Sequence, residues 1–310
     1  MRIVSLLPAA TEIIGLLGQL DCLVGVSHEC DFPPEVNAKP RVTYCPIHDE
    51  GLSSAEIDRW VRETLASQGT LYTLDEPLLR ELEPEIILTQ KLCDVCAVGY
   101  GSVQAFAATL ARTPQVLNLE PSSLSDIFEN IRFVAKVLDV PDRAEIAINA
   151  LIERIEAVKA RLANVVERPK CFLMEWIDPP FCSGHWGPEL VELAGGRDPL
   201  GLNGKDSIRI PWESVLEAQP EVMVLACCGH SPQRTMEDLS SLRRNLGWDG
   251  LPAVQRGRVY IVDGNAYFNR PGPRIVDSLE ILAEIIHPDL FARCFADRGV
   301  ICLGSDASNS

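Results

Sequence analysis

Short runs of apolar residues alternate along this chain with longer segments in which apolar residues return every three or four positions. The runs predict buried strands and the longer segments predict amphipathic helices. Strands are predicted at residues 3–7, 23–26, 41–43, 86–90, 116–119, 170–174, 222–226 and 259–262, and helices at 9–20, 54–67, 124–138, 141–166, 188–194 and 271–286. This alternation is typical of α/β folds, in which helices cover parallel sheets.

The two halves of the chain carry the same pattern. Residues 81–90 give a helix end, a Pro-Glu turn and an apolar strand before Cys93-Asp94-Val95-Cys96, and residues 217–226 give the same order before Cys227-Cys228-Gly229-His230. Parallel sheets bind ligands at the carboxyl ends of their strands. The sequence therefore predicts two Rossmann-like, three-layer α/β lobes with a ligand cleft between them.

The apolar stripe of residues 141–166 predicts the longest helix. A helix of about 25 residues spans roughly 37 Å, which is enough to run from one lobe to the other as a rigid bridge. Four parts are expected: an N-terminal lobe at 1–138, a bridging helix at 139–166, a C-terminal lobe at 167–296 and a flexible tail at 297–310.

Charge and apolar content narrow the class of partner. The formal net charge is −16, and the basic residues do not cluster, so neither nucleic acid nor an anionic membrane surface is an expected partner. No apolar run approaches the roughly 18 residues of a membrane span. The first residues lead directly into a strand, so no secretion leader is expected. With 11 cysteines, an odd number, we expect a reducing compartment and therefore a cytoplasmic location.

Thiol and imidazole groups follow several predicted strands. Cys93 and Cys96 have the spacing of a metal knuckle or of a redox pair, and equally of small residues that line a pocket. Four of the five histidines lie in loops at predicted strand ends, where they either line a cleft or are solvated: His28, His48, His185 and His230.

Aromatic side chains lie in the same loops. They are Tyr44, Trp176, Trp186 and Tyr267. Such side chains suit a flat or macrocyclic ligand, and they serve equally well as packed anchors of a loop. The sequence holds neither a phosphate-binding loop nor a nucleophile elbow, so catalysis is not expected.

Five motifs resemble, in the same order, segments of the cobalamin- and siderophore-binding proteins of ABC importers. They are VGVSHECDFPP at 24–34, LEPEII at 82–87, PPFCSG at 179–184, IPWESV at 210–215 and RPGPR at 270–274. The resemblance extends over nearly the whole chain and is greatest to the cobalamin-binding members. It implies two α/β lobes joined by one long rigid helix, with the ligand held between the lobes and not transformed.

The resemblance also implies site residues. It places six side chains in the cleft, namely His28, Tyr44, Cys93, Cys227, Cys228 and Tyr267. Positions in strand-end loops add five more candidates, namely Cys96, Trp176, His185, Trp186 and His230. Glu213 matches an acidic residue that docks on a membrane permease, and Glu76 is the candidate for the corresponding role in the first lobe.

Three hypotheses follow. The first is a cytoplasmic binding protein for cobalamin, another corrinoid or a related metal chelate, with a thiolate or an imidazole that reaches the metal. The second is a protein that binds zinc or another transition metal directly through Cys93, Cys96, His28 and His230. The third is an enzyme that acts on a corrinoid with Cys93 or Cys96 as its nucleophile.

Overall fold

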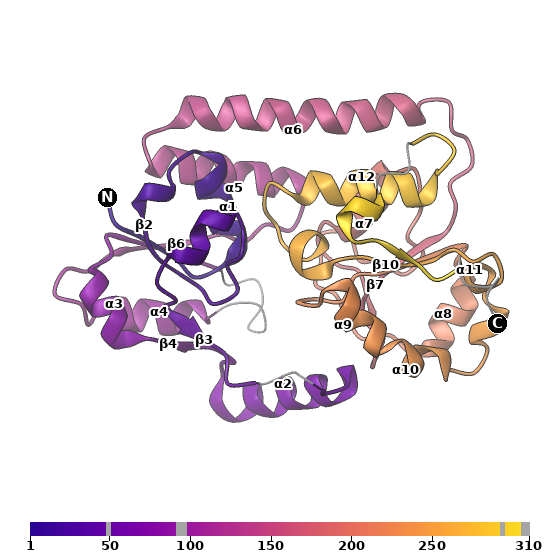
Figure 1. Ribbon diagram of the computed structural model, residues 1–310, viewed down its shortest axis with the longest axis horizontal. Helices are drawn as coiled ribbons and strands as arrows, with labels where there is room; N and C mark the ends of the chain where they lie inside the picture. The colour runs from indigo at the N-terminus through magenta and orange to yellow at the C-terminus, as the bar shows by residue number, and fades with distance from the viewer. Residues whose placement is uncertain (48–50, 91–97, 292–294, 305–310) are drawn as a thin grey trace. The chain divides into compact units, whose positions relative to one another are not determined.

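A computed structural model describes residues 1–47, 51–90, 98–291 and 295–304. The chain folds into two compact units. The N-terminal unit comprises Met1–Leu52, Arg59–Pro121 and Ser125–Asn149, and the C-terminal unit comprises Ser53–Asp58, Ser122–Leu124 and the chain from Ala150 onward. Figure 1 shows α6 (Pro141–Leu162) as one unbroken helix, and the boundary between the units lies within it.

The N-terminal unit is built on a four-stranded parallel sheet in the order β2-β1-β5-β6. Its strands are β1 (Ile3–Ser5), β2 (Leu23–Val26), β5 (Ile86–Thr89) and β6 (Gln115–Asn118). All residues of β1 and β5 are buried, as expected for strands that are covered on both faces. A separate antiparallel pair is formed by β3 (Thr43–Tyr44) and β4 (Thr73–Leu74).

Helices surround this sheet and close its core. They are α1 (Pro8–Leu16), α3 (Glu76–Leu82), α4 (Tyr100–Ala107) and most of α2 (Ser54–Gln68) and α5 (Leu124–Val137), with short 3₁₀ turns at Leu20–Cys22 and Pro34–Ala38. The core cluster includes Val4 and Ile87 from adjacent strands and Leu79 from α3. The apolar periodicity of the sequence therefore fixes which face of each element is buried.

The C-terminal unit contains a five-stranded sheet in the order β11-β10-β9-β7-β8. The central strands are parallel and both edge strands are antiparallel. The strands are β7 (Cys171–Trp176), β8 (Phe181–Cys182), β9 (Val222–Leu225), β10 (Val259–Ile261) and β11 (Ile301–Cys302). The sequence predicts a flexible tail from residue 297, whereas Ile301–Cys302 pair with β10 as an edge strand.

The helices of the C-terminal unit are mostly short. They are α7 (Gly187–Leu193), α8 (Trp212–Ala218), α9 (Pro232–Glu237), α10 (Leu239–Arg243), α11 (Pro252–Gln255) and α12 (Ile275–Ile286), with 3₁₀ turns at Trp248–Gly250 and Phe295–Arg298 and a π-turn at Gly264–Phe268. The closing helix is predicted from residue 271 and begins at Ile275, after the π-turn and a proline-rich bend.

The internal repeat is visible in the two sheets. The order β1-β5-β6 in the first unit corresponds to β7-β9-β10 in the second. In both units a short helix, α3 or α8, comes directly before the middle strand. The prediction of two α/β lobes is confirmed. The predicted cleft between them stays a prediction.

One arginine fixes each half of α6 to its own unit. Arg143 Nη1 donates to the carbonyl of Leu17 at 2.9 Å in the N-terminal unit. In the C-terminal unit, Arg154 Nη2 donates to Asp277 at 2.7 Å and to Glu280 at 2.8 Å on α12. The hydrogen bonds from Glu280 and then Asp277 raise the pKa of Arg154. In the described part of the chain, none of the helices combines the length and apolar character needed to cross a membrane.

Candidate functional site

His28 follows β2 and is fixed by Thr43 of β3. The Thr43 hydroxyl donates to Ser27 Oγ at 3.1 Å, so its oxygen is an acceptor for the groups that approach it. His28 Nδ1 lies 2.7 Å from that oxygen, and the backbone N–H of His28 donates to it at 3.1 Å. This arrangement places the ring proton on Nδ1 and leaves the lone pair on Nε2.

The Nε2 atom of His28 is a buried polar atom without a hydrogen-bond partner. It lies 3.1 Å from Oε1 of Glu29, but the contact lacks hydrogen-bond geometry and becomes an ion pair only if the ring is protonated. The ring also packs against Tyr72, with 5.3 Å between the ring centroids. An imidazole held in this way presents Nε2 as a possible ligand to a metal.

Arg41 holds the loop that carries His28, and the sequence analysis did not identify it. Its Nη1 donates to the carbonyls of Ser27 and Cys30. The Cys30 thiol is 1% exposed and lies 3.1 Å from Thr11 Oγ1. Cys30 therefore belongs to the framework of this loop, and the only sequence sign of Arg41 is its place in a predicted strand.

The other candidates of the first half separate into two groups. Tyr44 lies next to Thr43 in β3 and is 53% exposed, as expected when successive strand residues point to opposite faces. Cys93 and Cys96 lie outside the described residues, as does His48. Their predicted roles stay predictions.

Trp176 and His230 form an aromatic pair at the strand ends of the C-terminal unit. Trp176 is the last residue of β7, and His230 follows β9. Their ring centroids lie 4.8 Å apart with the planes inclined by 49°. The indole Nε1 donates to the carbonyls of Asp178 and Ser54, at 3.2 Å each. The structure thus brings together two predicted site residues that are 54 positions apart in the sequence.

The two adjacent cysteines after β9 have different environments. Cys227 is 1% exposed, and burial raises the pKa of its thiol to about 12. A thiol with so high a pKa is protonated at neutral pH, so it is a weak nucleophile and a poor metal ligand. Cys228 is partly exposed, and its N–H donates to the carbonyl of Glu175 at 3.0 Å. Of the two, Cys228 is the better candidate for ligand contact.

The remaining candidates of the second half make local contacts. Trp186 is 6% exposed and its Nε1 donates to the carbonyl of Phe268 at 2.9 Å, which favours the role of a packed anchor. His185 Nε2 lies 3.1 Å from Asp206 Oδ1. Tyr267 lies in the π-turn after β10, with the Arg274 guanidinium 5.4 Å from its ring centroid.

The two predicted docking residues occupy equivalent places in the two units. Glu76 is the first residue of α3, and Glu213 is in the first turn of α8. The Glu76 side chain is 55% exposed and forms an ion pair with Arg80 at 3.4 Å, and Glu213 is exposed. Since α3 and α8 both precede the middle strand of their sheet, the internal repeat relates the two glutamates.

Within the described ranges, no group of three or more His, Cys, Asp or Glu side chains is close enough to hold a metal ion. Of the four residues predicted to bind a metal directly, His28 and His230 belong to different units, and Cys93 and Cys96 lie outside the described ranges.

Comparison with known proteins gives three consistent results. The family model described as "Periplasmic binding protein" matches residues 3–266. The chain is 22% identical over 293 residues to a vitamin B12-binding protein of Vibrio cholerae, covering 90% of this chain and 86% of the relative. It is 22% identical over 302 residues to the uncharacterized ABC transporter substrate-binding lipoprotein YvrC of Bacillus subtilis, covering 94% and 81%.

A solved structure is similar over almost its whole length. The crystal structure of a periplasmic heme-binding protein from Pseudomonas aeruginosa has a TM-score of 0.71 and 19% sequence identity, with 93% of this chain and 92% of that chain covered. At this level of identity the similarity shows that the fold is shared.

Proposed function

Since the chain belongs to the periplasmic binding protein family, we propose that it binds a corrinoid or a related metal chelate. Members of this family are binding proteins and not enzymes, so the hypothesis of a thiol-dependent enzyme is set aside. Relatives named for vitamin B12 align with about nine-tenths of this chain. Direct binding of zinc or another bare metal ion has no support among the described residues.

The expectation of a cytoplasmic location is wrong. The matching family is that of periplasmic binding proteins, and one relative is a substrate-binding lipoprotein. That expectation rested on the cysteine content and on the first residues of the chain. Neither the cysteine content nor the first residues determine to which family the chain belongs.

The His28 imidazole is the observation that carries the proposal. Its Nδ1 is held by Thr43, and its Nε2 is a lone-pair donor without a hydrogen-bond partner. A metal already bound in a planar chelate needs one or two axial ligands, and a neutral imidazole provides one. Within the C-terminal unit, Trp176 and His230 form an aromatic surface at the strand ends, which by itself suits the face of a macrocycle.

Hydroxocobalamin is the direct test of this function, with hemin as the alternative chelate and Zn²⁺ as the bare metal. We expect hydroxocobalamin to bind with one-to-one stoichiometry in calorimetry and with a shift of its visible absorption bands as its exchangeable ligand is replaced. A preference for hemin would identify a different chelate. Binding of Zn²⁺ alone, with no response to either chelate, would contradict the proposal.

Replacing His28 with alanine is expected to weaken hydroxocobalamin binding by about tenfold, because one axial contact of about 1.4 kcal/mol is lost. The shift of the absorption bands should disappear at the same time. His287→Ala is the matched control, since that imidazole bonds to Gly195 O at the end of α7 and does not follow a strand. An unchanged spectral shift in the His28 variant would remove His28 from the site.

Replacing Glu76 and Glu213 together with alanine is expected to leave hydroxocobalamin affinity unchanged and to weaken binding to a permease. Exposed charge pairs contribute up to about 1 kcal/mol each, so the double change should cost roughly tenfold. The measurement is the concentration of loaded protein that gives half-maximal ATPase stimulation of an ABC permease in liposomes. Glu129→Ala, an exposed glutamate on α5, is the control. Equal stimulation by both variants would exclude these two residues from docking.

A further inference from the structure

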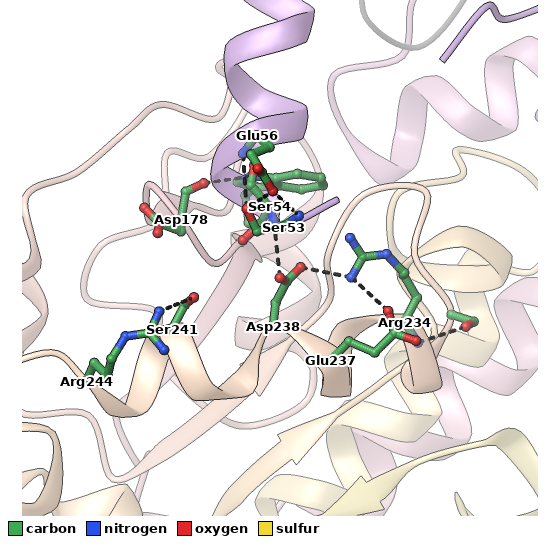
Figure 2. Close-up of polar contacts among 11 residues, drawn as sticks. Ser53, Ser54, Glu56, Asp178, Arg234, Glu237, Asp238, Ser241 and Arg244 are labelled. Atoms are coloured by element: carbon green, nitrogen blue, oxygen red, sulfur yellow. Dashed lines mark hydrogen bonds and ion pairs between the residues drawn. The ribbon is translucent and has the colours of Figure 1, made fainter. Parts of the chain in front are cut away.

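The beginning of α2 belongs to a different unit from the rest of that helix. Residues Ser53–Asp58 pack with the C-terminal unit, whereas the helix from Arg59 onward is part of the N-terminal unit. Figure 2 shows the first residues of this segment beside Asp178 and near Asp238, which lies between α9 and α10, and Arg234 of α9. The contacts therefore join residues from the first fifth of the chain to residues of its second half.

Hydrogen bonds and an ion pair hold this segment on the C-terminal unit. The Ser54 N–H donates to Asp238 Oδ1 at 3.2 Å, and the Trp176 indole donates to the Ser54 carbonyl at 3.2 Å. The Asp58 carboxylate forms an ion pair with Arg209, with 2.5 Å between Nη2 and Oδ1. Ser54 is 1% exposed and the Asp58 side chain is 10% exposed, so the segment is buried where it touches the unit.

The helix does not need these contacts for its own capping. The Ser53 N–H and hydroxyl donate to Glu56 Oε2 at 2.8 and 2.7 Å, and the Glu56 N–H donates to Ser53 Oγ at 3.4 Å. This is a complete capping box. The Asp238 carboxylate lies at the N-terminus of α2, where the helix dipole is positive, but it comes from a distant element. Because α2 is already capped by its own residues, the contact with Asp238 serves to dock the helix on the C-terminal unit.

One docking residue, Asp238, lies at the end of α9 (Pro232–Glu237), and His230 lies just before the start of the same helix. Arg234 Nη1 donates to Asp238 Oδ2 at 3.0 Å and holds the carboxylate in place. The N–H of Arg234 donates to Ser231 Oγ at 3.3 Å, and Ser231 is the residue directly after His230. Arg234 of α9 therefore contacts both Asp238 and the residue next to His230.

We propose that residues Ser53–Asp58 form a latch that completes the ligand-binding surface of the C-terminal unit by positioning Trp176. The proposal rests on the function proposed above. The Trp176 N–H is shared between the carbonyls of Asp178 and Ser54, and the ring lies against His230. When the latch leaves, the indole loses one of its two acceptors. Ligand binding and latch docking then stabilise each other by the same factor, since coupling between two sites is reciprocal.

Two features make docking of the latch reversible. The Ser54 hydroxyl oxygen is buried without a hydrogen-bond partner, which opposes docking. The Arg209 side chain is 40% exposed, so its ion pair with Asp58 is screened by solvent and salt. The docked and undocked states of the latch therefore differ little in free energy, and a ligand that holds the Trp176 ring in place favours the docked state.

Backbone hydrogen exchange of residues 53–58, with and without hydroxocobalamin or hemin, tests the proposal. We expect either bound chelate to slow exchange in this segment. Asp58→Asn and Arg209→Gln should each abolish that protection and raise the ligand dissociation rate by about tenfold. The double variant should be no worse than either single one, because all three lack the same ion pair. The control is Glu63→Gln, which changes an exposed residue of the same helix, α2.

The outcomes separate the latch from the ligand function. If a chelate binds to the wild-type protein but neither protects residues 53–58 nor dissociates faster from the variants, the latch is wrong and the ligand function stands. A lower thermal midpoint in the variants with unchanged ligand-linked protection also overturns the latch, since it reveals a purely structural contact. If neither chelate binds to the wild-type protein, the function proposed above fails and the latch fails with it.

Discussion

Replacing Gly264 with alanine is expected to destabilise the C-terminal unit by at least about 3 kcal/mol, a value typical of severe overpacking. A Cβ atom at this position would lie 2.1 Å from the carbonyl oxygen of Cys227 and 2.8 Å from the carbonyl carbon of Ala226. Both are backbone atoms at the end of β9, so no side-chain rotation relieves the contact. The π-turn that begins at Gly264 and the loop that carries Cys227 must therefore separate.

The same contact positions the candidate site. The N–H of Asn265 donates to the carbonyl of His230 at 3.3 Å, and Asn269 Nδ2 donates to the carbonyl of Ala226 at 2.7 Å. A shift of the π-turn would move His230 away from Trp176. We therefore expect any folded fraction of Gly264→Ala to bind hydroxocobalamin more weakly than the wild-type protein.

Urea unfolding measures this effect, with Gly250→Ala as the matched control. A Cβ at Gly250 meets no atom within 4 Å, and its φ lies outside the left-handed region. The control should change the free energy of unfolding by less than about 1 kcal/mol. Equal unfolding midpoints for the two variants would show that the backbone of β9 and the π-turn is not packed as described.

Raising the pH from 4 to 7 is expected to reduce the stabilisation that Asp198 gives to the folded protein by about 2.4 kcal/mol. Burial raises the pKa of Asp198 from its ordinary 3.8 to about 6, against the effect of its hydrogen bonds. The largest of these comes from Ser183 Oγ, at 2.7 Å, and three more come from backbone N–H groups, those of Leu200 and Gly201 at 3.0 Å each and that of Leu173 at 3.4 Å. A difference of roughly two pKa units corresponds to about 3 kcal/mol in total, most of which is lost between pH 4 and 7.

The sign follows from proton binding. Between pH 4 and 6 the folded state retains the Asp198 proton while the unfolded state has lost it, so the folded state binds more protons. The contribution of Asp198 is fully present below pH 4 and is lost as the pH rises through 6. Other carboxylates, such as Glu280, have a lowered pKa and act in the opposite direction, so the total stability of the protein does not isolate this group.

Asp198→Asn isolates it, because asparagine is a neutral isostere of the protonated acid. The difference in unfolding free energy between the wild-type protein and Asp198→Asn should fall by about 2.4 kcal/mol from pH 4 to 7. Urea unfolding at several pH values gives this difference directly. A difference that does not vary with pH would mean that Asp198 is not buried in the folded protein.

The sequence predicted local structure well where apolar periodicity decided it. The strands around residues 86–89 and 222–225 and the helix from Pro141 were all found close to their predicted limits. The helix predicted at residues 141–166 ends at Leu162. The apolar residue at the predicted end of the helix is not buried against the rest of the protein. That residue, Val166, is 92% exposed. The strand-end loops were also identified correctly, since strand ends follow from the limits of the strands.

The contacts that shape the candidate site could not be predicted in this way. Thr43 fixes the His28 ring across 15 positions, and Asp238 meets Ser54 across 184. No pattern of neighbouring residues indicates such pairs. The capping box of Ser53 and Glu56 is readable in the sequence, but it reveals only where the helix begins. It gives no sign that the first turn of α2 packs with the other unit.

The sequence by itself determined the class of the chain, its repeated strand and helix order and the loops that contain the candidate ligand residues. These depend on periodicity and turn chemistry, which are local properties of the chain. Only the tertiary structure decided which side chains in those loops are free to act. It buried the Cys227 thiol, fixed the His28 proton on Nδ1 and placed Trp176 between His230 and Ser54. The physical reason is that burial and hydrogen bonding depend on neighbours in space, and folding brings these together from distant positions.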